Sequence, residues 1–333
     1  MKAANLYAVN DLRYDEIEKP ECADDEVLVE IKSCGICGSD IPRVFTKGTY
    51  HFPTVIGHEF SGVVVEDKTG KYDGARVAVF PLLPCFECES CKNENYAACV
   101  DYDYYGSRRN GGMAEYIAVK RWNLVLLPDN ISFDEGAMCE PISVGRHAVK
   151  KLGIKSGDNL LISGAGPIGI IAGQWAKSEG AKDVYYFDID NRKIDFAKTL
   201  GFKEYNEEIK IDCVIEGTGH SAALEKCLKA VKPFGRVVLM GNPAGEVTLS
   251  QNTYWYILRK ELTVSGTWNS SYAEHNNDWK ESIKAISEGV LNVKPLITHR
   301  FPLSECNKAF DMMKERKEFY NKVMLTMNRD KER

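Results

Sequence analysis

The sequence has little of what marks a membrane protein or a nucleic-acid-binding protein. It contains no apolar run near the roughly 20 residues that a membrane-spanning helix needs. Neither sign of charge dominates, because 43 Lys and Arg stand against 48 Asp and Glu, whereas a nucleic-acid-binding surface favours a basic stripe. The first residues, MKAANLYAVNDLRYDEIEKP, hold no apolar stretch of the kind found in signal peptides. We therefore expect a cytoplasmic protein that binds a small molecule and neither nucleic acid nor a membrane.

Low-complexity segments and internal repeats are also missing, which favours ordinary globular domains. The length of 333 residues exceeds that at which one hydrophobic core usually stops growing. Two domains are therefore predicted.

Cysteine, by contrast, is plentiful. Eleven is an odd number, and thiols stay reduced in the cytosol, so a disulfide framework is not expected. Four cysteines fall in the polar, turn-rich segment PCFECESCKNENYAAC, at positions Cys85, Cys88, Cys91 and Cys99. Four thiolates at such spacing suit a tetrahedral zinc ion and leave no open coordination position, so this metal would be structural. The alternative is a cluster of inert buried thiols, for which this segment would be a poor core.

The pattern of strands and helices changes near the middle of the chain. Residues 1 to about 145 contain short strand-like runs between Gly and Pro, such as HEFSGVVVED. The stretch DNLLISGAGPIGIIAGQWAKSEGAKDVYYFDID then predicts a strand, a glycine-rich turn, a helix and a second strand, and further strands alternate with helices after it. Such alternation predicts an α/β fold with a doubly wound parallel sheet. From about Val293 the pattern returns to strand, helix and strand, which fits either domain.

The segment GAGPIG predicts a dinucleotide-binding turn. Gly164, Gly166 and Gly169 form the G-x-G-x-x-G pattern, with Pro167 and Ile168 inside it, after a predicted strand and at the start of a predicted helix. The first glycine permits the tight turn, the second lets the backbone approach a pyrophosphate, and the third allows close packing of helix on strand. The positive end of the helix then faces the phosphates. A tight turn without a ligand is the alternative.

An acidic residue at the end of the next strand bears on which dinucleotide binds. Asp188 lies nineteen residues after Gly169, where an acid binds the adenosine ribose hydroxyls and repels a 2′-phosphate. NAD is therefore favoured over NADP. Arg192 favours NADP instead, because it is close enough in sequence to pair with the 2′-phosphate. A solvated acid at a strand end is the alternative for Asp188.

A second set of metal-binding side chains is spread along the chain. Cys37 belongs to CGICGSD, His58 and Glu59 belong to GHEFSG, and Glu140 belongs to CEPISVG. A thiolate, an imidazole and a carboxylate can hold zinc and leave one position for water or substrate. Spacing alone is weak support for this second site, because the residues are far apart in sequence.

Taken in order, CGICGSD, GHEFSG, the four-cysteine segment, EPISVG and GAGPIG resemble the zinc-dependent medium-chain alcohol and polyol dehydrogenases. The resemblance spans nearly the whole chain, and EPISVG is similar to the sorbitol dehydrogenase branch. It implies a mainly-β GroES-like catalytic domain over 1–145, with a structural zinc lobe at 85–99. A Rossmann NAD-binding domain over 146–292 would be inserted, and 293–333 would return to the catalytic domain. The active site would lie in the cleft between the two domains.

The same resemblance assigns cofactors and ligands. Members of this family bind NAD and two zinc ions per chain, one catalytic and one structural. By that likeness Cys37 and His58 are ligands of the catalytic zinc, and the third ligand is Glu59, Glu140 or both. A homodimer or homotetramer is also implied, and the predicted strand ELTVSGTW is a plausible pairing edge.

The proton of the alcohol needs a route out of such a site. Ser39 resembles a family hydroxyl that relays this proton, and a helix-capping serine is the alternative. Many relatives have His where this chain has Pro42, and proline cannot carry a proton. We therefore expect the proton to leave through Ser39, Glu59, Glu140 and water, or through His51.

Arginines near these motifs bear on the substrate. Arg43 replaces a tyrosine that contacts the polyol in sorbitol-type relatives, and Arg108 and Arg109 lie in GSRRNGG, in a segment that borders the substrate cleft of the family. A guanidinium can bind a phosphate through paired hydrogen bonds, so these residues favour a phosphorylated polyol. Tyr50 and Glu140 are further candidates for contacts with substrate hydroxyls. Exposed, salt-bridging arginines are the alternative.

The expected reaction is the oxidation of galactitol 1-phosphate to tagatose 6-phosphate with hydride transfer to NAD. The motifs CGSDIPR, PLLPCF, YDYYGSRRNGGMAEY and RKELTVSG are similar to those of relatives that use this substrate. An unphosphorylated polyol dehydrogenase of sorbitol or xylitol type is the first alternative, and an enzyme for amino alcohols such as threonine is a more distant one. A non-catalytic NAD-binding zinc protein is the remaining alternative.

Overall fold

The computed structural model describes residues 1–327 and divides into two compact units. The first unit joins Met1–Glu140 with the chain from Ser271 onward, and the second unit is Pro141–Ser270. The second unit is shorter than the expected range 146–292, because residues 271–292 pack with the first unit.

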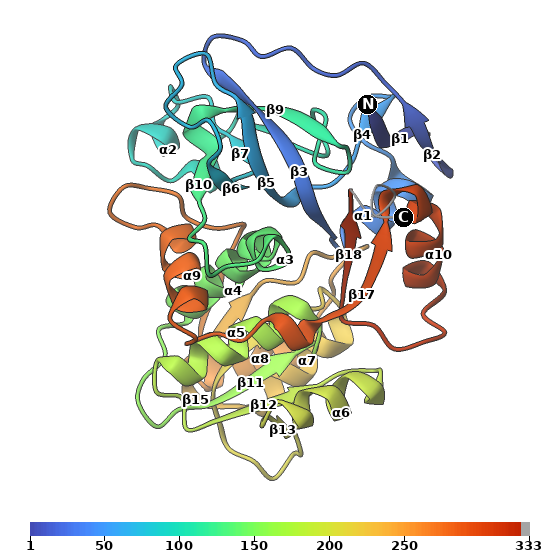
Figure 1. Ribbon diagram of the computed structural model, residues 1–333. Coiled ribbons are helices and arrows are strands. Elements are labelled where there is room, and N and C mark those ends of the chain that lie inside the picture. Colours follow the sequence, from blue (N-terminus) through green and yellow to red (C-terminus); the bar gives the residue numbers. More distant parts are fainter. Residues whose placement is uncertain (328–333) are drawn as a thin grey trace. The chain divides into compact units, whose positions relative to one another are not determined.

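A seven-stranded, largely antiparallel sheet forms the body of the first unit (Figure 1). Its strands run in the order β10 (Leu124–Leu126), β6 (Arg76–Val79), β5 (Glu59–Glu66), β3 (Glu26–Ile36), β18 (Lys322–Thr326) and β17 (Ile297–Pro302), and β9 (Tyr116–Lys120) also pairs with β3. The strands β17 and β18 pair in parallel, whereas β5 and β18 flank β3 in antiparallel register. A strand from the far end of the chain thus completes the sheet around β3.

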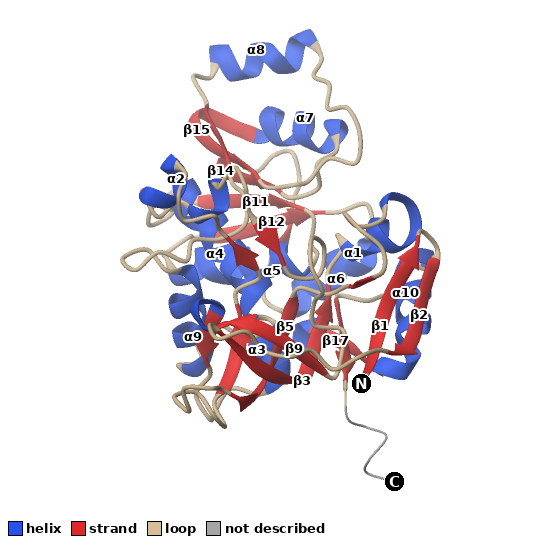
Figure 2. Ribbon diagram, turned by 90° about the horizontal axis from the view of Figure 1, so that it is seen from above, coloured by secondary structure: helices blue, strands red, loops and turns tan. Residues whose placement is uncertain are grey.

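Smaller elements surround this sheet. A three-stranded sheet contains β1 (Lys2–Ala8), β2 (Asp11–Glu16) and β4 (Thr54–Val55), and α10 (Cys306–Glu315) lies beside it (Figure 2). A short ladder pairs β7 (Leu82–Leu83) with β8 (Asp103–Tyr104). The remaining helices are α1 (Asp40–Pro42), η1 (Arg43–Lys47), α2 (Glu89–Lys92), η2 (Tyr96–Ala98), η3 (Arg121–Asn123), α3 (Phe133–Ala137), α9 (Asp278–Ser287), η4 (Lys294–Leu296) and η5 (Leu303–Glu305).

The second unit holds a six-stranded parallel sheet in the order β13-β12-β11-β14-β15-β16. Its strands are β11 (Asn159–Ser163), β12 (Asp183–Phe187), β13 (Lys203–Glu204), β14 (Ile211–Glu216), β15 (Val231–Leu239) and β16 (Thr263–Gly266). Its helices are α5 (Pro167–Ser178), α6 (Asn191–Thr199), α7 (Ser221–Ala230), α8 (Gln251–Arg259) and most of α4 (Cys139–Leu152). This is the doubly wound strand order in which a dinucleotide binds where the order reverses, here between β11 and β14.

The apolar content of β11 explains its central place. Leu160, Leu161 and Ile162 are all fully buried, as expected of a parallel strand that is covered on both faces. The expected fold class, a Rossmann sheet inserted in a mainly-β domain, is therefore confirmed.

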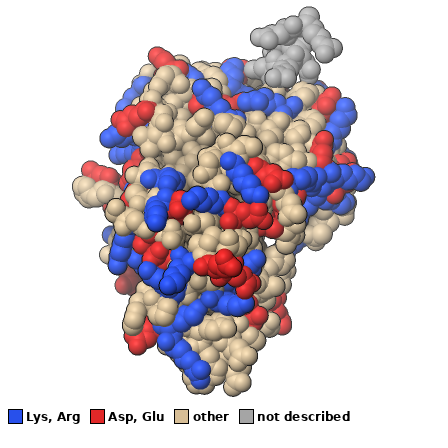
Figure 3. Space-filling model, turned by 90° about the horizontal axis from the view of Figure 1, so that it is seen from below, with Lys and Arg blue, Asp and Glu red and all other residues tan. Residues whose placement is uncertain are grey.

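The surface agrees with the near balance of charges in the sequence. Acidic and basic side chains are intermingled on the face drawn in Figure 3. Within residues 1–327, no helix combines the length and the apolarity that crossing a bilayer requires. All eleven cysteines are free thiols.

Candidate active site and metal centres

The register of β3 brings the predicted catalytic ligands together. Cys37 follows directly after this strand, and Gly35 near its end pairs with Glu59, the first residue of β5. His58 precedes Glu59 in the chain. The ligand atoms of Cys37, His58 and Glu59 all lie within 4.8 Å of one another. A thiol, an imidazole and a carboxylate at this spacing fit a single zinc ion.

Asp40 holds this group in place, and the sequence analysis did not single it out. Its fully buried carboxylate accepts hydrogen bonds from the Cys37 amide at 3.0 Å and from Arg43 Nη1 at 2.7 Å, and Oδ1 lies 3.5 Å from His58 Nδ1. Burial raises the pKa of Asp40, but the charges of His58 and Arg43 and the Cys37 amide outweigh it and lower the pKa to about 2. The ionised carboxylate lies on the Nδ1 side of the His58 ring, where carboxylates stand behind metal-binding histidines, at a distance longer than a hydrogen bond. The sequence did contain a signal for this role, because Asp40 is the last residue of the motif CGICGSD.

A buried ion pair joins Glu59 to Lys322, which the sequence analysis also missed. Lys322 is 2% exposed, contacts the Glu59 carboxylate and donates to the Ile36 carbonyl at 3.2 Å. Burial lowers the pKa of Lys322, but Glu59 and other acidic groups nearby outweigh it and raise the pKa overall. The pair needs glycine at Gly35, because a Cβ there would lie 2.7 Å from Lys322 Cε. No local pattern around Lys322 indicates this role.

Glu140 lies near Cys37, His58 and Glu59, but its carboxylate is not within 4.8 Å of all of their ligand atoms. It is 6% exposed in the first turn of α4, and the Tyr104 hydroxyl donates to its Oε1 at 3.4 Å. The Tyr104 ring also lies 5.7 Å from the His58 ring. Burial raises the pKa of Glu140, His58 lowers it and Glu59 raises it, with a net value of about 7. The carboxylate of Glu140 is not among the donors within 4.8 Å of one another.

Ser39 and Arg43 contact each other beside this group. Ser39 precedes α1, but its side chain makes no capping hydrogen bond. Its hydroxyl accepts a hydrogen bond from Arg43 Nη1 at 2.9 Å. The same nitrogen pairs with Asp40, so the guanidinium of Arg43 is engaged within the site. The helix-capping alternative for Ser39 is therefore not supported.

The four clustered cysteines fit a tetrahedral metal ion. The ligand atoms of Cys85, Cys88, Cys91 and Cys99 lie within 4.8 Å of one another. The sulfurs of Cys85 and Cys91 are 3.9 Å apart, and those of Cys88 and Cys99 are 4.0 Å apart. Sulfurs bound to one zinc at about 2.3 Å would lie about 3.8 Å apart, whereas a disulfide would hold them near 2 Å. Hydrogen bonds from the amides of Val100 and Cys91 lower the pKa of Cys88 to about 6, whereas burial raises the pKa of Cys91 to about 12. Cys88 is therefore the cysteine of this pair that most readily forms a metal-binding thiolate.

Aromatic rings fasten the four-cysteine lobe to the rest of the first unit. The Trp122 ring lies 4.9 Å from Phe86 and 5.2 Å from Tyr96, which both belong to the lobe. On its other side Trp122 lies 5.0 Å from Tyr272, which stacks on Phe80 at 4.4 Å. These edge and stacking contacts give the polar lobe an apolar anchor.

The glycine-rich turn of the second unit has the geometry of a dinucleotide-binding loop. Gly164 has a φ of +94°, which a side chain would strain. A Cβ at Gly169 would collide with the Gly164 carbonyl, whereas one at Gly166 would meet nothing within 4 Å. Gly166 and Pro167 begin α5, and Ile168 follows inside it. The backbone at the helix start is therefore open to an approaching phosphate.

Asp188 lies beside this turn. Its carboxylate accepts hydrogen bonds from the amides of Ala165 and Asp190, both at 2.9 Å. Arg192 is bound to Asp190, with its Nη2 2.8 Å from the carboxylate. A further residue that the sequence analysis missed is Glu216, at the end of β14, whose carboxylate accepts from the Thr218 amide at 2.7 Å.

The remaining predicted substrate residues lie in two loops of the first unit. Arg108 stacks on the Tyr50 ring, with 4.3 Å between guanidinium and ring centroid. Arg109 pairs with Asp103 at 2.6 Å.

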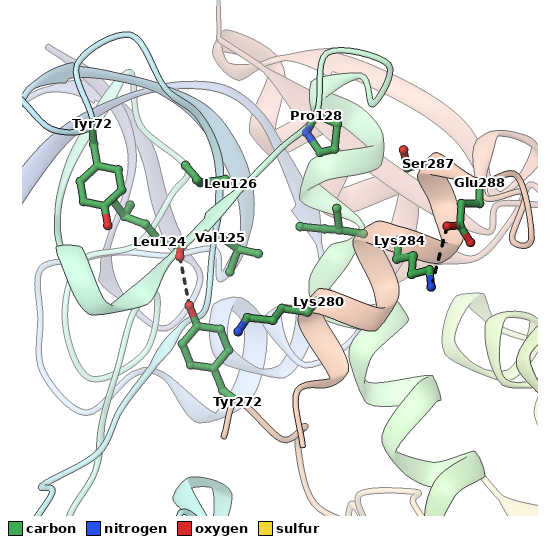
Figure 4. Close-up of a pocket in the computed structure, with 11 residues that line it drawn as sticks. Tyr72, Leu124, Val125, Leu126, Pro128, Tyr272, Lys280, Lys284, Ser287 and Glu288 are labelled. Carbon is green, nitrogen blue, oxygen red and sulfur yellow. Dashed lines mark hydrogen bonds and ion pairs between the residues drawn. The ribbon is translucent and has the colours of Figure 1, made fainter. Parts of the chain in front are cut away.

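A pocket of about 430 Å³ lies elsewhere in this unit, between β10 and α9 (Figure 4). The Tyr272 hydroxyl donates to the Leu124 carbonyl at 3.0 Å inside it, and Lys284 pairs with Glu288 at 3.9 Å. No residue of either metal group lines this pocket, so it is distinct from the candidate active site.

Comparison with known proteins agrees with both units. Residues 23–129 match the family described as "Alcohol dehydrogenase GroES-like domain", and residues 167–288 match "Zinc-binding dehydrogenase". The chain is 39% identical over 295 residues to a galactitol 1-phosphate 5-dehydrogenase of Escherichia coli K12, a match that covers 83% of this chain and 85% of the relative. It is 34% identical over 341 residues to a sorbitol dehydrogenase of Bombyx mori, covering 94% and 95%.

A solved structure shows the same architecture. The crystal structure of galactitol-1-phosphate dehydrogenase from Escherichia coli superposes with a TM-score of 0.91 at 35% identity, over 98% of this chain and 100% of that one. Family, sequence and fold agree, and the metal-binding side chains fit them. The chain belongs to the zinc-dependent medium-chain dehydrogenase family.

Proposed function

We propose that this protein is an NAD-dependent dehydrogenase that oxidises galactitol 1-phosphate, or a closely related polyol phosphate, at a secondary alcohol. The observation that carries the proposal is the group formed by Cys37, His58 and Glu59, whose ligand atoms lie within 4.8 Å of one another. The 39% identity to a galactitol 1-phosphate 5-dehydrogenase supports the choice of substrate.

The proposed cofactors are two zinc ions and NAD. Cys37 and His58 would hold the catalytic ion, and the four clustered cysteines would hold the structural one. We favour Glu140 over Glu59 as the third catalytic ligand, because Lys322 already neutralises Glu59. Glu59 lies nearer and would exchange with Glu140 or orient the site.

The proposed dinucleotide site uses the turn around Gly164, Gly166 and Gly169, with Pro167 and Ile168 at the start of α5. Asp188 would bind the ribose hydroxyls, which favours NAD. Arg192 is bound to Asp190 and is therefore not held ready for a 2′-phosphate.

The side chains around the metal group have separable tasks in this reaction. When bound, zinc supplies a Lewis acid that lowers the pKa of the alcohol, and NAD accepts the hydride. Asp40 accepts a hydrogen bond from the Cys37 amide and lies 3.5 Å from His58 Nδ1. The Ser39 hydroxyl can relay the alcohol proton by accepting it while passing its own proton to water, and Arg43 orients this hydroxyl. When Glu59 takes its place as the ligand, Glu140, with a pKa of about 7 in the absence of metal, can take up or release a proton near neutral pH.

Oxidation of a free polyol is the second candidate, and the sorbitol dehydrogenase at 34% identity supports it. A non-catalytic NAD-binding zinc protein is a more distant candidate, because a binding module has no need of an open metal site. The zinc content and the substrate preference separate the three candidates.

We also propose that the protein acts as a homodimer or homotetramer in the cytoplasm. The strand β16 is an edge strand of the parallel sheet, and an exposed edge can pair with the same edge of a second copy. Near it Tyr254, Trp255 and Leu258 on α8 are 55%, 41% and 48% exposed. The eleven free thiols favour a reducing compartment.

The substrate is tested by following NAD reduction with galactitol 1-phosphate and with galactitol. We expect kcat/KM to be at least about tenfold higher for the phosphate ester, since one charge-assisted hydrogen bond contributes about 1.5–3 kcal/mol. Sorbitol and xylitol serve as further comparisons. Faster turnover of a free polyol would replace the proposed substrate by the second candidate.

Zinc content tests the two metal groups separately. We expect two zinc ions per chain in the parent protein and one each in Cys37→Ser and Cys91→Ser, measured by elemental analysis. Cys37→Ser should lose turnover and retain NAD binding, because the dinucleotide site lies in the other unit. Cys22→Ser, a change outside both groups, should keep two ions and full activity. Undiminished turnover in Cys37→Ser would refute the catalytic assignment.

Unfolding measurements test the pairing of Glu59 with Lys322. Lys322→Met should cost about 3–5 kcal/mol of unfolding free energy, because it leaves a buried carboxylate without its cation. The double variant Glu59→Gln/Lys322→Met should lose clearly less than the sum of the two single variants. The exposed pair of Lys2 and Glu16, 3.3 Å apart, is the matched control, and its removal should change stability by less than about 1 kcal/mol. Additive losses at Glu59 and Lys322 would exclude a paired role.

Cofactor preference tests Asp188. We expect Asp188→Ala to raise the KM for NAD about tenfold and to shift the ratio of NADP to NAD use toward NADP, because a negative charge facing the 2′-position is removed. Asp195→Ala removes an exposed acid on α6 and should leave that ratio unchanged. A parent protein that already prefers NADP would contradict the assignment.

A further inference from the structure

Three arginines are candidates for binding the phosphate of the proposed substrate, and two of them already have partners. Arg43 donates to Asp40 at 2.7 Å and to Ser39 at 2.9 Å. Arg109 is paired with Asp103 through a 2.6 Å contact. A guanidinium that is committed to a carboxylate has fewer donors left for a second anion.

Arg108 is held differently from the other two. Its guanidinium carbon lies 4.3 Å from the Tyr50 ring centroid and 4.4 Å from the Tyr102 ring centroid. Within residues 1–327, no Asp or Glu carboxylate pairs with Arg108. Stacked rings cover the faces of a guanidinium, whereas its N–H donors lie in its plane. The contact with the Tyr50 hydroxyl, at 3.3 Å, leaves most of these donors available.

The backbone of this loop is fixed as well. The Arg108 amide donates to the Tyr104 carbonyl at 3.0 Å, and the Arg108 carbonyl lies 2.9 Å from His51 Nε2. A side chain that is ordered before the ligand arrives loses less conformational entropy on binding. Arg108 is therefore a preorganised cation on the rim of the first unit, where Tyr50 is 70% exposed.

A row of rings links Arg108 to the catalytic group. The Tyr102 ring lies 6.3 Å from the Tyr104 ring, which lies 5.7 Å from the His58 ring. The Arg108 guanidinium lies 4.4 Å from the Tyr102 ring. Together these three steps place it at most about 16 Å from the centre of the His58 ring. An extended polyol phosphate spans about 7–8 Å from its fifth carbon to phosphorus, at about 1.2 Å per bond. With a hydrogen bond of about 2.8 Å at the phosphate end, the substrate spans roughly 10–11 Å, which lies within this upper limit of about 16 Å.

We propose that Arg108, which lies against the rings of Tyr50 and Tyr102, is the residue that binds the phosphate group of the substrate. This inference rests on the proposed function. Arg43, which the sequence favoured for the same task, is instead a positioning residue that acts through Asp40 and Ser39. Substitution of the two arginines should therefore have different effects. Loss of Arg108 should impair binding of the phosphate ester alone, whereas loss of Arg43 should impair the reaction of both the ester and the free polyol.

Steady-state kinetics with galactitol 1-phosphate and galactitol test this assignment. Arg108→Gln should raise the KM for the ester about 10- to 100-fold, which corresponds to the loss of one or two charge-assisted hydrogen bonds. The KM for galactitol and the kcat for both substrates should change less than about twofold. Arg108→Lys keeps the charge without the planar fork and should give an intermediate KM. Arg43→Gln should lower kcat/KM for both substrates by a similar factor.

Arg13→Gln is the matched control, because Arg13 also stacks on a tyrosine, Tyr7, at 4.4 Å. It should leave both KM values unchanged. Inorganic phosphate provides a second readout, and it should inhibit the parent competitively and Arg108→Gln at least about tenfold more weakly. Zinc content and Tm, equal in parent and variants, establish that each variant is folded.

The outcomes separate the two proposals. If the parent prefers the ester and Arg108→Gln retains that preference, the Arg108 assignment is overturned and the proposed function stands. Equal losses on both substrates in Arg108→Gln also overturn it. A parent that prefers galactitol overturns the proposed function and this assignment together.

Discussion

The candidate catalytic group, Cys37, His58 and Glu59, depends on the position of β3 between β5 and β18. This register places Gly35 opposite Glu59 and Ile36 opposite Val323, so that three segments distant in sequence meet at one end of one strand. If β5 or β18 slipped by one residue along β3, the side chains of Glu59 and Lys322 would point to opposite faces of the sheet. The long apolar run of β3, in which Val27, Val29 and Ile31 are fully buried, fixes this register because any slip would expose part of the core.

The charged side chains buried around Cys37, His58 and Glu59 lie against side chains of opposite charge. Asp40 faces Arg43 and His58, and Glu59 faces Lys322. An unpaired ion in such a place would cost several kcal/mol, so each anion requires its cation. Under the proposed function, Cys37 and the carboxyl of Glu140, whose partner is a hydroxyl, would balance the charge of the catalytic zinc. The same bonds hold the ligands still, which a metal site needs for a defined geometry.

Local motifs allowed much of this site to be predicted from sequence. The four-cysteine lobe and the glycine-rich turn are short segments whose spacing already fixes their geometry, and the structure gives both the expected shape. Lys322 could not be found in this way, because its partner carbonyl lies 286 residues away and only strand pairing joins them. Arg43 was predicted to contact the substrate, and the sequence does not reveal its contact with Asp40.

The boundary between the units was harder to predict for a related reason. Helical periodicity identifies α9 and its apolar face, but not the sheet that this face covers. The helix packs with the first unit, where Trp279 is buried and lies 5.6 Å from Phe80. The sequence analysis placed residues 271–292 in the middle domain, contacts group them with the first unit, and the match to "Zinc-binding dehydrogenase" extends to residue 288.

The place of β18 in the chain has a consequence for biosynthesis. Translation delivers this strand only after the whole second unit has been made. Until then β3 lacks one neighbour, and Glu59 faces no ammonium group. The second unit is continuous in sequence and can fold on the ribosome while the first waits. A nascent chain halted before Lys322 would thus carry a finished nucleotide-binding turn beside a metal centre that still has an uncompensated charge.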